Sequence, residues 1–173
     1  GVTRTNDVVL RREMRQLEGA WVSNIALERS KQRIQQLPYI EKVEFEKNRV
    51  EGSDDLVDVE YTIKEGPSAQ LSGGIGYSES SAFILNGSYA DSNFMGTGKR
   101  VALELNTGKY SKVLSFSHSN PYVGINNISR TYSLRYSDVT QFVSASSDFS
   151  SKSLGAGLDF GYPITEWQGV RFG

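Results

Sequence analysis

The stretch Leu-Gly-Ala-Gly-Leu-Asp-Phe-Gly-Tyr at residues 154–162 alternates an apolar side chain with a small or acidic one along its whole length. Successive side chains of a β-strand point to opposite faces of a sheet, so this period of two predicts a strand with one apolar face. The same alternation recurs in five earlier segments, at residues 71–78, 83–90, 101–106, 114–119 and 132–137. A seventh strand is expected at 168–172. This part of the chain is therefore expected to be a run of antiparallel strands.

The polar face of these expected strands is made mostly of glycine, serine and asparagine, with isolated charges such as Glu104, Arg135 and Asp159. The exposed sheet of a soluble protein carries dense Lys and Glu instead, whereas the lumen of a membrane barrel suits a face of this kind. Each strand is about eight to eleven residues long, near the length that crosses a bilayer at a tilt. A membrane barrel is favoured. A secreted β-sandwich, whose strands also alternate, stays open as the other interpretation.

Aromatic residues follow every second expected strand. The candidate interfacial residues are Phe94, Tyr122, Tyr162 and Trp167. Tyr and Trp suit the boundary between lipid and water because their rings are amphipathic. The connection at 138–152 is long and polar, which predicts an external loop.

Charge is distributed unevenly along the 173 residues, whose net charge is −1. Residues 1–66 hold 24 charged side chains, whereas the 107 residues of 67–173 hold only 15 and carry 13 of the 17 glycines. We expect a charged α/β unit at 1–66 and the strand-rich part at 67–173, with Gly66 and Pro67 at the boundary. The near-neutral charge gives no electrostatic basis for nucleic-acid binding.

Several classes are excluded by what the composition lacks. The chain has no Cys, so disulfide scaffolds and thiolate metal sites are excluded. No apolar run approaches 18 residues and no basic apolar leader occurs, so neither a transmembrane helix nor a signal peptide is expected.

Two helices are expected in residues 1–66. Capping oxygens at 5–7 precede apolar residues at helical spacing as far as Leu17, and Gly19 would end that helix. Ser23 or Asn24 would cap a second helix, which Pro38 would stop. The residues expected to be buried are Val9, Leu10, Met14, Leu17, Ile25, Leu27, Ile34 and Leu37.

Two strands should follow these helices. Val43 and Phe45 alternate with glutamates, and residues 57–64 alternate strictly between apolar and polar side chains. The segment at 51–55 is a turn signal between them. The predicted order is α-α-β-β, which makes a thin core, so a preceding strand outside this chain is suspected.

At this point the residues resemble a known family. Residues 7–21, Asp-Val-Val-Leu-Arg-Arg-Glu-Met-Arg-Gln-Leu-Glu-Gly-Ala-Trp, are similar to the start of the last POTRA domain of the BamA family, the central subunits that insert β-barrels into bacterial outer membranes. Residues 73–77 resemble the first barrel strand of that family, residues 93–98 its first inner turn and residues 119–122 its second. The resemblance covers essentially the whole chain in the right order.

The resemblance implies an α+β POTRA domain of β-α-α-β-β order at 1–66, with its first strand absent. It implies that 67–173 form the first six to seven strands of an antiparallel transmembrane barrel of about sixteen strands, making the chain a fragment of a longer protein. The implied location is the bacterial outer membrane, with the POTRA domain in the periplasm. The implied partners are the lipoproteins of the assembly machine, unfolded outer-membrane proteins and lipid. No enzyme activity and no cofactor are implied.

The resemblance also implies that a weak barrel seam opens and pairs with an incoming strand. The gate strand consists of Gln70, Leu71, Ser72, Gly73, Gly74, Ile75, Gly76, Tyr77 and Ser78. Glycine removes cross-strand side-chain contacts and adds backbone freedom, which weakens pairing. The plainer alternative is that the glycines relieve crowding or let the strand bend.

A second expected site lies in the first helix. Arg11, Arg15 and Glu18 stand at spacings of four and three residues, so they could share one exposed helix face. The resemblance places this helix against the partner lipoprotein, with Glu18 central. The alternative is a solvated face with an intrahelical ion pair. The strand at 56–64 could in addition accept an extended client by β-addition.

No catalytic or metal-binding constellation is found. His118 is the only His, so neither a metal site nor a Ser-His-Asp arrangement can be built around it. Asp91, Glu104, Arg135 and Asp159 are expected to face a barrel lumen and to pair internally. The Gly-Thr-Gly-Lys at 96–99 lacks the spacing of a phosphate-binding loop and is expected to be a turn.

Three rival functions remain open at this stage. A POTRA-barrel transporter of the two-partner type shares the architecture but secretes its client. A passive, porin-like barrel would conduct solutes without folding anything. An outer-membrane enzyme is disfavoured because no catalytic constellation is present.

Overall fold

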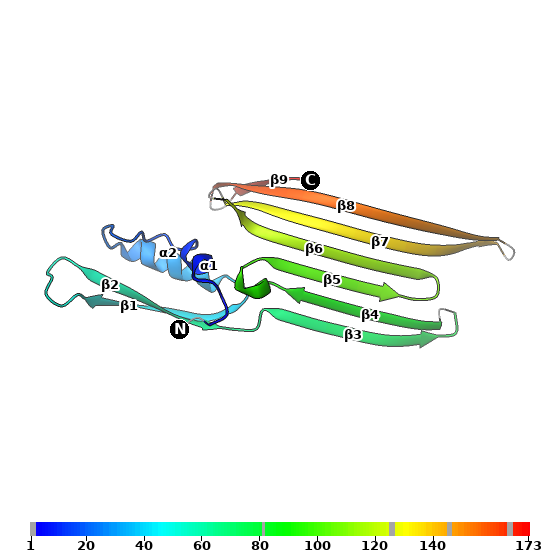
Figure 1. The fold of residues 1–173 in the computed structure, drawn as a ribbon, viewed down its shortest axis with the longest axis horizontal. Coiled ribbons are helices and arrows are strands. Elements are labelled where there is room, and N and C mark those ends of the chain that lie inside the picture. The colour runs from blue at the N-terminus through cyan, green and yellow to red at the C-terminus, as the bar shows by residue number, and fades with distance from the viewer. Residues whose placement is uncertain (1–2, 81, 125–126, 145–146, 166–167) are drawn as a thin grey trace. The chain divides into compact units, whose positions relative to one another are not determined.

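The computed structural model describes residues 3–80, 82–124, 127–144, 147–165 and 168–173 (Figure 1). The chain divides into two compact units. The first comprises Gly1–Ser68 together with Met95–Gly98, and the second comprises Ala69–Phe94 and Lys99–Gly173.

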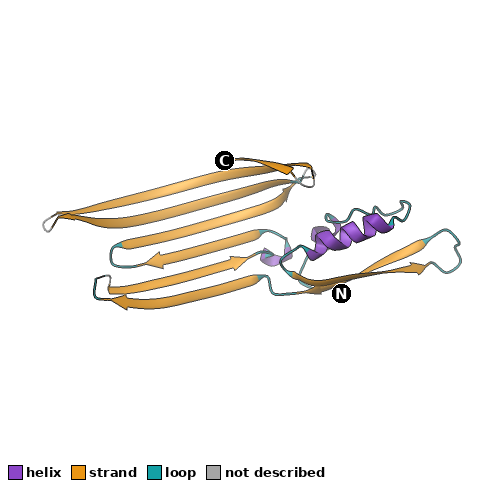
Figure 2. Cartoon of the chain, turned by 180° about the vertical axis from the view of Figure 1, so that it is seen from behind, coloured by secondary structure: helices purple, strands orange, loops and turns teal. Residues whose placement is uncertain are grey.

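The first unit contains two helices and a β-hairpin in the expected order. They are α1 (Asp7–Arg11), α2 (Asn24–Gln35), β1 (Ile40–Arg49) and β2 (Val57–Glu65). Helix α2 packs along one face of the hairpin, as Figures 1 and 2 show. The buried cluster consists of Val9, Leu10, Ile34, Tyr39, Ile40 and Val43, with Met14, Leu37, Tyr61 and Ile63 packed against it.

Helix α2 begins and ends as the sequence predicts. The Ser23 hydroxyl accepts a hydrogen bond from the Ala26 N–H at 3.3 Å, which satisfies a backbone donor of the first turn. Leu27 and Ile34 are fully buried, as expected. Ile25 is 67% exposed, so its predicted burial is wrong.

Helix α1 is shorter than predicted. It ends at Arg11 instead of continuing to Leu17, and Leu17 is 72% exposed rather than buried. The chain leaves the helix because Ser30, buried in α2, accepts hydrogen bonds from the N–H groups of Arg15 and Gln16 at 2.7 and 3.3 Å. A partner on α2 thus replaces the helical partners that these two amides would otherwise have.

The two strands of the first unit form an antiparallel hairpin. Their register runs from Ile40 opposite Glu65 to Arg49 opposite Val57, with one irregularity near Ile40. Gly52 lies at a φ of +85° in the connection, which confirms the turn predicted at 51–55.

The second unit is a single antiparallel sheet of seven strands in chain order (Figures 1 and 2). The strands are β3 (Ala69–Ser78), β4 (Ala82–Asp91), β5 (Arg100–Thr107), β6 (Ser111–Val123), β7 (Ile128–Ser144), β8 (Ser147–Thr165) and β9 (Gln168–Phe172), with a short 3₁₀ turn, η1 (Phe94–Gly96), between β4 and β5. The predicted fold class, an α+β unit followed by antiparallel strands, is confirmed.

Two predicted connections are strand instead. Of the loop expected at 138–152, residues 138–144 belong to β7 and 147–152 to β8, whose pairing continues through Val139 opposite Ser151 and Gln141 opposite Phe149. Backbone pairing does not depend on apolar side chains, so the polar segment extends the hairpin. The Asn-Pro-Tyr at 120–122 lies inside β6, at a shift of register where Pro121, which has no N–H, is tolerated.

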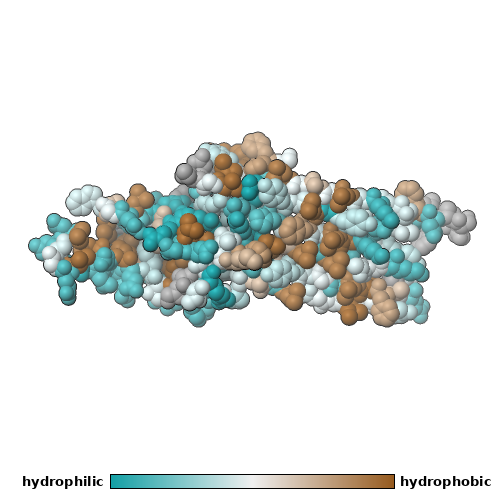
Figure 3. Space-filling model, in the orientation of Figure 1, coloured by the Kyte–Doolittle hydropathy of each residue, from teal (hydrophilic) through white to brown (hydrophobic). Residues whose placement is uncertain are grey.

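Apolar side chains lie open on the second unit. Leu71, Ile75, Leu103, Leu134 and Leu154 are all exposed, and apolar residues spread over the strands in Figure 3. A patch of this extent on a soluble protein would mark a contact surface. Within the described residues, no helix has both the length and the apolar character needed to span a bilayer.

Candidate functional sites: an edge strand and a charged loop

Strand β3 contains the residues of the predicted gate, Gln70 to Ser78. It is one edge of the seven-stranded sheet and, in the part of the chain that the structure describes, pairs with β4 alone. Its side chains are open: Leu71 is 83% exposed. An edge strand presents backbone N–H and C=O groups that can pair with a further strand.

The pairing of β3 with β4 has a gap in its middle. On the apolar face, Leu71 stands opposite Tyr89, and Ile75 stands opposite Leu85. Between them Gly73 faces Gly87, so this position has no side-chain contact across the strands. Such cross-strand contacts stabilise a sheet by about 0.2–1 kcal/mol each.

The polar face of the same hairpin has a pocket beside these glycines. A pocket of about 320 Å³ is lined by Ser72, Gly73, Gly74, Asn86, Gly87, Ser88, Glu104 and Asn106. Opposite hydroxyls of Ser72 and Ser88 are hydrogen-bonded to each other. The next row, Gly74 opposite Asn86, carries a side chain on one strand only.

The pair β5–β6 of the same sheet has side chains facing each other in every row. Leu103 faces Phe116 and Leu105 faces Leu114 on the apolar face. Every row from Val101 to Thr107 carries side chains on both strands. Rows with glycine on one strand also occur in β7–β8, at Gly155, Gly157 and Gly161, but among the described pairs a row with glycine on both strands is found only in the edge hairpin.

Crowding does not account for the glycines of β3 within the described sheet. A Cβ on Gly74 would meet nothing within 4 Å, and a Cβ on Gly76 would reach Ile84 only at 3.9 Å. At Gly73 the nearest atom is the Asn86 carbonyl oxygen at 3.4 Å, an ordinary contact. These positions do not require glycine for space, which counts against the plainer alternative of relieved crowding.

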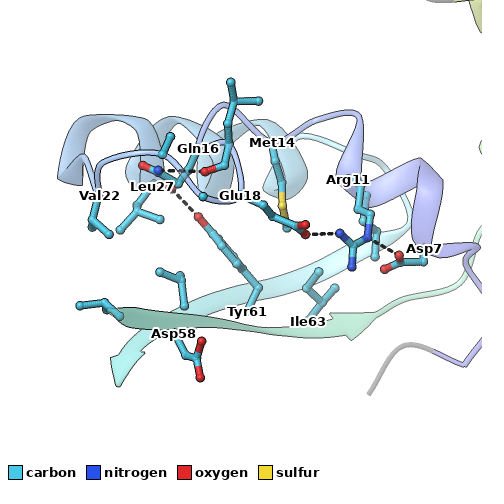
Figure 4. A pocket seen from close by; sticks show the side chains of 16 residues that line it. Asp7, Arg11, Met14, Gln16, Glu18, Val22, Leu27, Asp58, Tyr61 and Ile63 are labelled. Atoms are coloured by element: carbon cyan, nitrogen blue, oxygen red, sulfur yellow. Dashed lines mark hydrogen bonds and ion pairs between the residues drawn. The ribbon is translucent and has the colours of Figure 1, made fainter. Parts of the chain in front are cut away.

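The second predicted site is a set of exposed charges on the first unit. Arg11 forms ion pairs with Asp7, four residues earlier in α1, and with Glu18 in the following loop. The hydrogen bonds to Asp7 and then Glu18 raise the pKa of the Arg11 guanidinium. Figure 4 shows Arg11 between the two carboxylates.

The helical basis of that prediction is wrong, because Arg15 and Glu18 lie beyond the end of α1. The structure brings Arg11 and Glu18 together through the loop. Arg15 is half-buried, and its guanidinium donates to the carbonyl oxygens of Arg12 and Met14 at 3.5 and 3.3 Å. The three side chains therefore do not share one helix face.

Sequence reasoning missed an apolar surface beside Glu18. The exposed residues are Leu17, Trp21, Val22 and Ile25, of which Trp21 is 97% exposed. The helical interpretation assigned Leu17 and Ile25 to the core. The signal that could have found this surface is Gly19, whose φ of +73° breaks the helical spacing between them. Clustered apolar side chains at a surface mark an interaction site.

A pocket of about 550 Å³ opens next to these residues (Figure 4). Tyr61 and Ile63 of β2 form one wall, and the charged residues at its rim include Asp7, Arg11 and Glu18. Strand β2 pairs only with β1 among the described residues, so its second edge lies open.

The four predicted interfacial aromatics fall in different places. Phe94 begins η1, Tyr122 lies near the end of β6 and Tyr162 is exposed in β8. Trp167 lies outside the described residues. The described part of the chain contains no cluster of three or more His, Asp or Glu side chains that could hold a metal ion. The His118 ring instead faces that of Tyr132, with centroids 6.4 Å apart.

One expected lumen charge is on the opposite face. Asp91 comes two residues after Tyr89 in β4, so the two side chains share the apolar face, and the Tyr89 hydroxyl donates to the Asp91 carboxylate at 3.3 Å. The Asn93 N–H donates to the same carboxylate at 2.9 Å, and Asp91 is buried. Its role at the strand end is to cap the following turn, so the predicted lumen position is wrong.

Comparison with known proteins gives relatives over the whole length. The POTRA family model, described as a surface antigen variable number repeat, matches residues 1–66, and the Omp85 superfamily domain matches residues 93–173. The outer membrane protein assembly factor BamA of Neisseria meningitidis serogroup B is 29% identical over 175 residues, covering 100% of this chain and 22% of that protein. BamA of Buchnera aphidicola is 25% identical and covers 98% of this chain and 27% of its own length. The chain thus spans about a quarter of these relatives.

A solved structure agrees with the sequence matches. The crystal structure of BamA from Haemophilus ducreyi lacking POTRA domains 1–3 superimposes with a TM-score of 0.77 at 32% identity, covering 96% of this chain and 32% of that one. Both family models and the named relatives point to the same architecture, with a POTRA repeat ahead of Omp85 strands. The chain belongs to the BamA family of the Omp85 superfamily.

Proposed function

We propose that this chain is part of an outer-membrane assembly factor that folds and inserts β-barrel proteins. Residues 1–66 would be a periplasmic POTRA domain and residues 67–173 the first strands of the barrel. The family membership and the names of the relatives support this proposal. The observation that supports the mechanism is that β3 has an open edge and belongs to a hairpin depleted in cross-strand side-chain contacts.

In the proposed mechanism, β3 is the template for an incoming client strand. Its outward N–H and C=O groups supply main-chain hydrogen bonds without regard to client sequence, so many clients can be accepted. The glycines at 73, 74 and 76 weaken the hold of this strand on any neighbour, which lets the neighbour exchange for a client. No side-chain chemistry is required, so no cofactor is part of the proposal.

Cysteine cross-linking in the full-length protein tests this mechanism. Residues 1–173 contain no Cys, so single Cys residues can be placed along Gln70–Ser78, with any Cys elsewhere in the full-length protein replaced by Ser, and paired with Cys residues in the last strand of a stalled client. Templating predicts disulfide adducts that follow the strand register. Leu105→Cys, in a strand paired on both sides, is the matched control. Adduct yields along β3 no higher than at Leu105 would contradict the mechanism.

Reconstitution separates this function from its rivals. A denatured barrel client added to liposomes should fold faster when the full-length protein is present. A passive pore would conduct solutes without changing that rate. A two-partner transporter would move its client across the bilayer rather than leave it inserted, which protease protection of the client distinguishes.

We also propose that the loop after α1 binds a lipoprotein of the assembly machine. Glu18, held by Arg11, offers a charge beside the exposed Leu17 and Trp21. An apolar patch with a charged rim is the usual composition of a protein interface. Arg15 would act by shaping the loop through its backbone bond to Ser30.

Glu18→Lys tests this surface. The Glu18 side chain is 85% exposed, so the fold should tolerate the reversal, whereas a bound partner would meet the wrong charge. We expect several-fold less lipoprotein to co-purify with the full-length protein. Asp55→Lys, an exposed reversal in the β1–β2 turn, is the control and should leave co-purification unchanged. Equal recovery with Glu18→Lys would contradict the proposed interface.

A further inference from the structure

The turn that joins β4 to β5 is built into the first unit. Met95–Gly98 lie between two strands of the second unit in sequence, yet they cluster with Gly1–Ser68 as one compact body. Gly96 and Gly98 are both buried there. We call Met95–Gly98 the anchor turn.

Gly96 lies directly against the backbone of the segment before α1. Its carbonyl oxygen accepts a hydrogen bond from the Asn6 N–H at 2.8 Å. A Cβ on Gly96 would lie 1.9 Å from the carbonyl oxygen of Arg4 and 3.1 Å from its carbonyl carbon. Both atoms belong to the backbone and cannot turn aside, so this approach is open to glycine alone.

Gly98 lies against the buried core of the same unit. Its Cβ would lie 2.8 Å from Cγ1 of Val9 and 3.3 Å from the hydroxyl oxygen of Tyr39, two members of the core cluster. The guanidinium of Arg12 would be closer still, at 2.5 Å from Nη2. The anchor turn therefore makes two close backbone approaches, one to the segment before α1 and one to the core.

The segment that contacts the anchor turn, residues 3–6, is also bound by Glu65. The N–H groups of Thr3, Arg4 and Thr5 all donate to the Glu65 carboxylate, at 3.1, 3.1 and 2.8 Å. Glu65 is the last residue of β2. The segment 3–6 thus connects the end of β2 to the anchor turn, through the Glu65 carboxylate on one side and the backbone hydrogen bond between Asn6 and Gly96 on the other.

We propose that Gly96 and Gly98 are positioning residues that seat the anchor turn in the POTRA unit and thereby hold the ends of β4 and β5. Strand β4 is the direct neighbour of the edge strand β3, and the anchor turn follows β4 closely in the chain, so seating the turn would restrain the motion of that strand end. The activity part of this inference rests on the proposed function. The seating itself does not.

Two other glycines serve as controls that distinguish loss of the close contact from strain in the turn conformation. Gly124 lies at a φ of +74° after β6, and Gly52 at +85° in the first unit, nearly the conformation of Gly96 at +73°. A Cβ on either control would meet nothing within 4 Å. Alanine at all of these positions imposes a similar conformational strain, but only at Gly96 and Gly98 does it also block a close approach.

The experiment measures amide hydrogen exchange in the full-length protein for Gly96→Ala and Gly98→Ala, with Gly124→Ala and Gly52→Ala as controls. Seating predicts that exchange in the peptide covering residues 92–100 rises by about five- to tenfold in the two anchor variants, the factor expected from loss of a hydrogen bond. The controls should change exchange only in their own turns. Equal exchange at 92–100 in parent and anchor variants would overturn the inference, as would an equal rise with Gly124→Ala.

A third variant covers the case in which alanine prevents folding. Asn6 has a φ of −65° and a ψ of 139°, which proline adopts, so Asn6→Pro fits this backbone and removes the N–H that binds Gly96, together with an exposed side chain that makes no capping hydrogen bond. It should raise exchange at 92–100 without adding an atom to the turn. Unchanged exchange with Asn6→Pro and Gly98→Ala would overturn the seating.

The client-folding rate in liposomes tests the positioning role. Release of the turn should lower that rate several-fold, while the controls stay at the parent value. A raised exchange with an unchanged rate would overturn the positioning role and leave the seating. A parent protein that fails to fold clients would instead contradict the proposed function, and the exchange result would still decide the seating.

Discussion

At the scale of single residues, Glu65 accepts hydrogen bonds from three consecutive backbone N–H groups, those of residues 3–5. Partial burial raises the pKa of its carboxyl group, but the hydrogen bonds from the Thr5 side chain and from the N–H groups of residues 3–5 outweigh that effect and lower the pKa to about 2. A carboxylate whose pKa is lowered on folding stabilises the folded state at pH values above its ordinary pKa of 4.5. That stabilisation is lost as the pH falls from 4.5 towards 2.

Glu65→Gln should lower the free energy of unfolding of the first unit by about 1–2 kcal/mol at pH 7, because hydrogen bonds to a charged acceptor become hydrogen bonds to a neutral one. Urea titration of the full-length protein in detergent, followed by helical circular dichroism, measures this change. Glu60→Gln, an exposed position on the same strand, should change it by less than about 0.5 kcal/mol. A variant whose stability still falls between pH 4.5 and 2 as the parent's does would show that another group is responsible.

At the scale of elements, one hydroxyl decides where α1 ends. Ser30 is fully buried, donates to the Ala26 carbonyl at 2.7 Å and accepts from the N–H groups of Arg15 and Gln16. Ser30→Ala leaves these amides without their acceptor, so the unit should lose about 1–3 kcal/mol. The same urea titration measures it, and Ser53→Ala in the exposed β1–β2 turn is the control. A loss below about 0.5 kcal/mol would mean that the loop holds its shape by other contacts.

The glycines of β3 lead to a prediction about how tightly the whole strand pairs. Gly74→Val fits the open space beside Asn86 and adds β-propensity, which should tighten β3 pairing by about 0.5–1 kcal/mol. The fold should tolerate the change, while client folding in liposomes slows because the strand exchanges its neighbour less readily. Gly155→Val in β8, where the nearest atom to a Cβ is 3.9 Å away, is the control. Equal rates for both variants would contradict a role for weak pairing at β3.

At the scale of the whole molecule, the two faces of the seven-stranded sheet should meet different surroundings. Leu103 lies on the apolar face of β5, and Ser117 on the polar face of β6 between Ala102 and Ser133. Leu103→Arg should cost roughly 2–4 kcal/mol in a bilayer if that face meets lipid, whereas Ser117→Arg would point into a polar lumen. Gel mobility of unheated full-length protein measures the folded fraction in liposomes. Equal folding of the two variants would show that the apolar face does not contact lipid.

Strand positions were predictable because alternation is a local property. Residues 83–90 were expected as strand, and β4 spans Ala82–Asp91. Ser23 as the cap of α2 was predictable for the same reason, since capping involves only neighbouring residues. Errors arose where a distant partner intervened: Ser30 ends α1, and the β7–β8 pairing extends through residues expected to be a loop.

The candidate sites divide in the same way. The candidate gate strand was predicted from its glycines and its resemblance to a family, but its register, with Gly73 opposite Gly87, is given only by the fold. Glu18 was named from a helical spacing that does not exist, and its contact with Arg11 arises from the loop. The exposed Trp21 surface was missed because an assumed helix assigned its neighbours to the core.

The order of residue types along the chain by itself determined that two helices precede a hairpin and a run of two-faced antiparallel strands, because periodicity and capping act over a few neighbouring residues. Only the tertiary structure decided which glycines are needed for space. Gly74 of β3 faces open space, whereas Gly96 meets the backbone of Arg4, far away in sequence. The reason is that close approach depends on which distant segments meet, and side-chain periodicity carries no record of that.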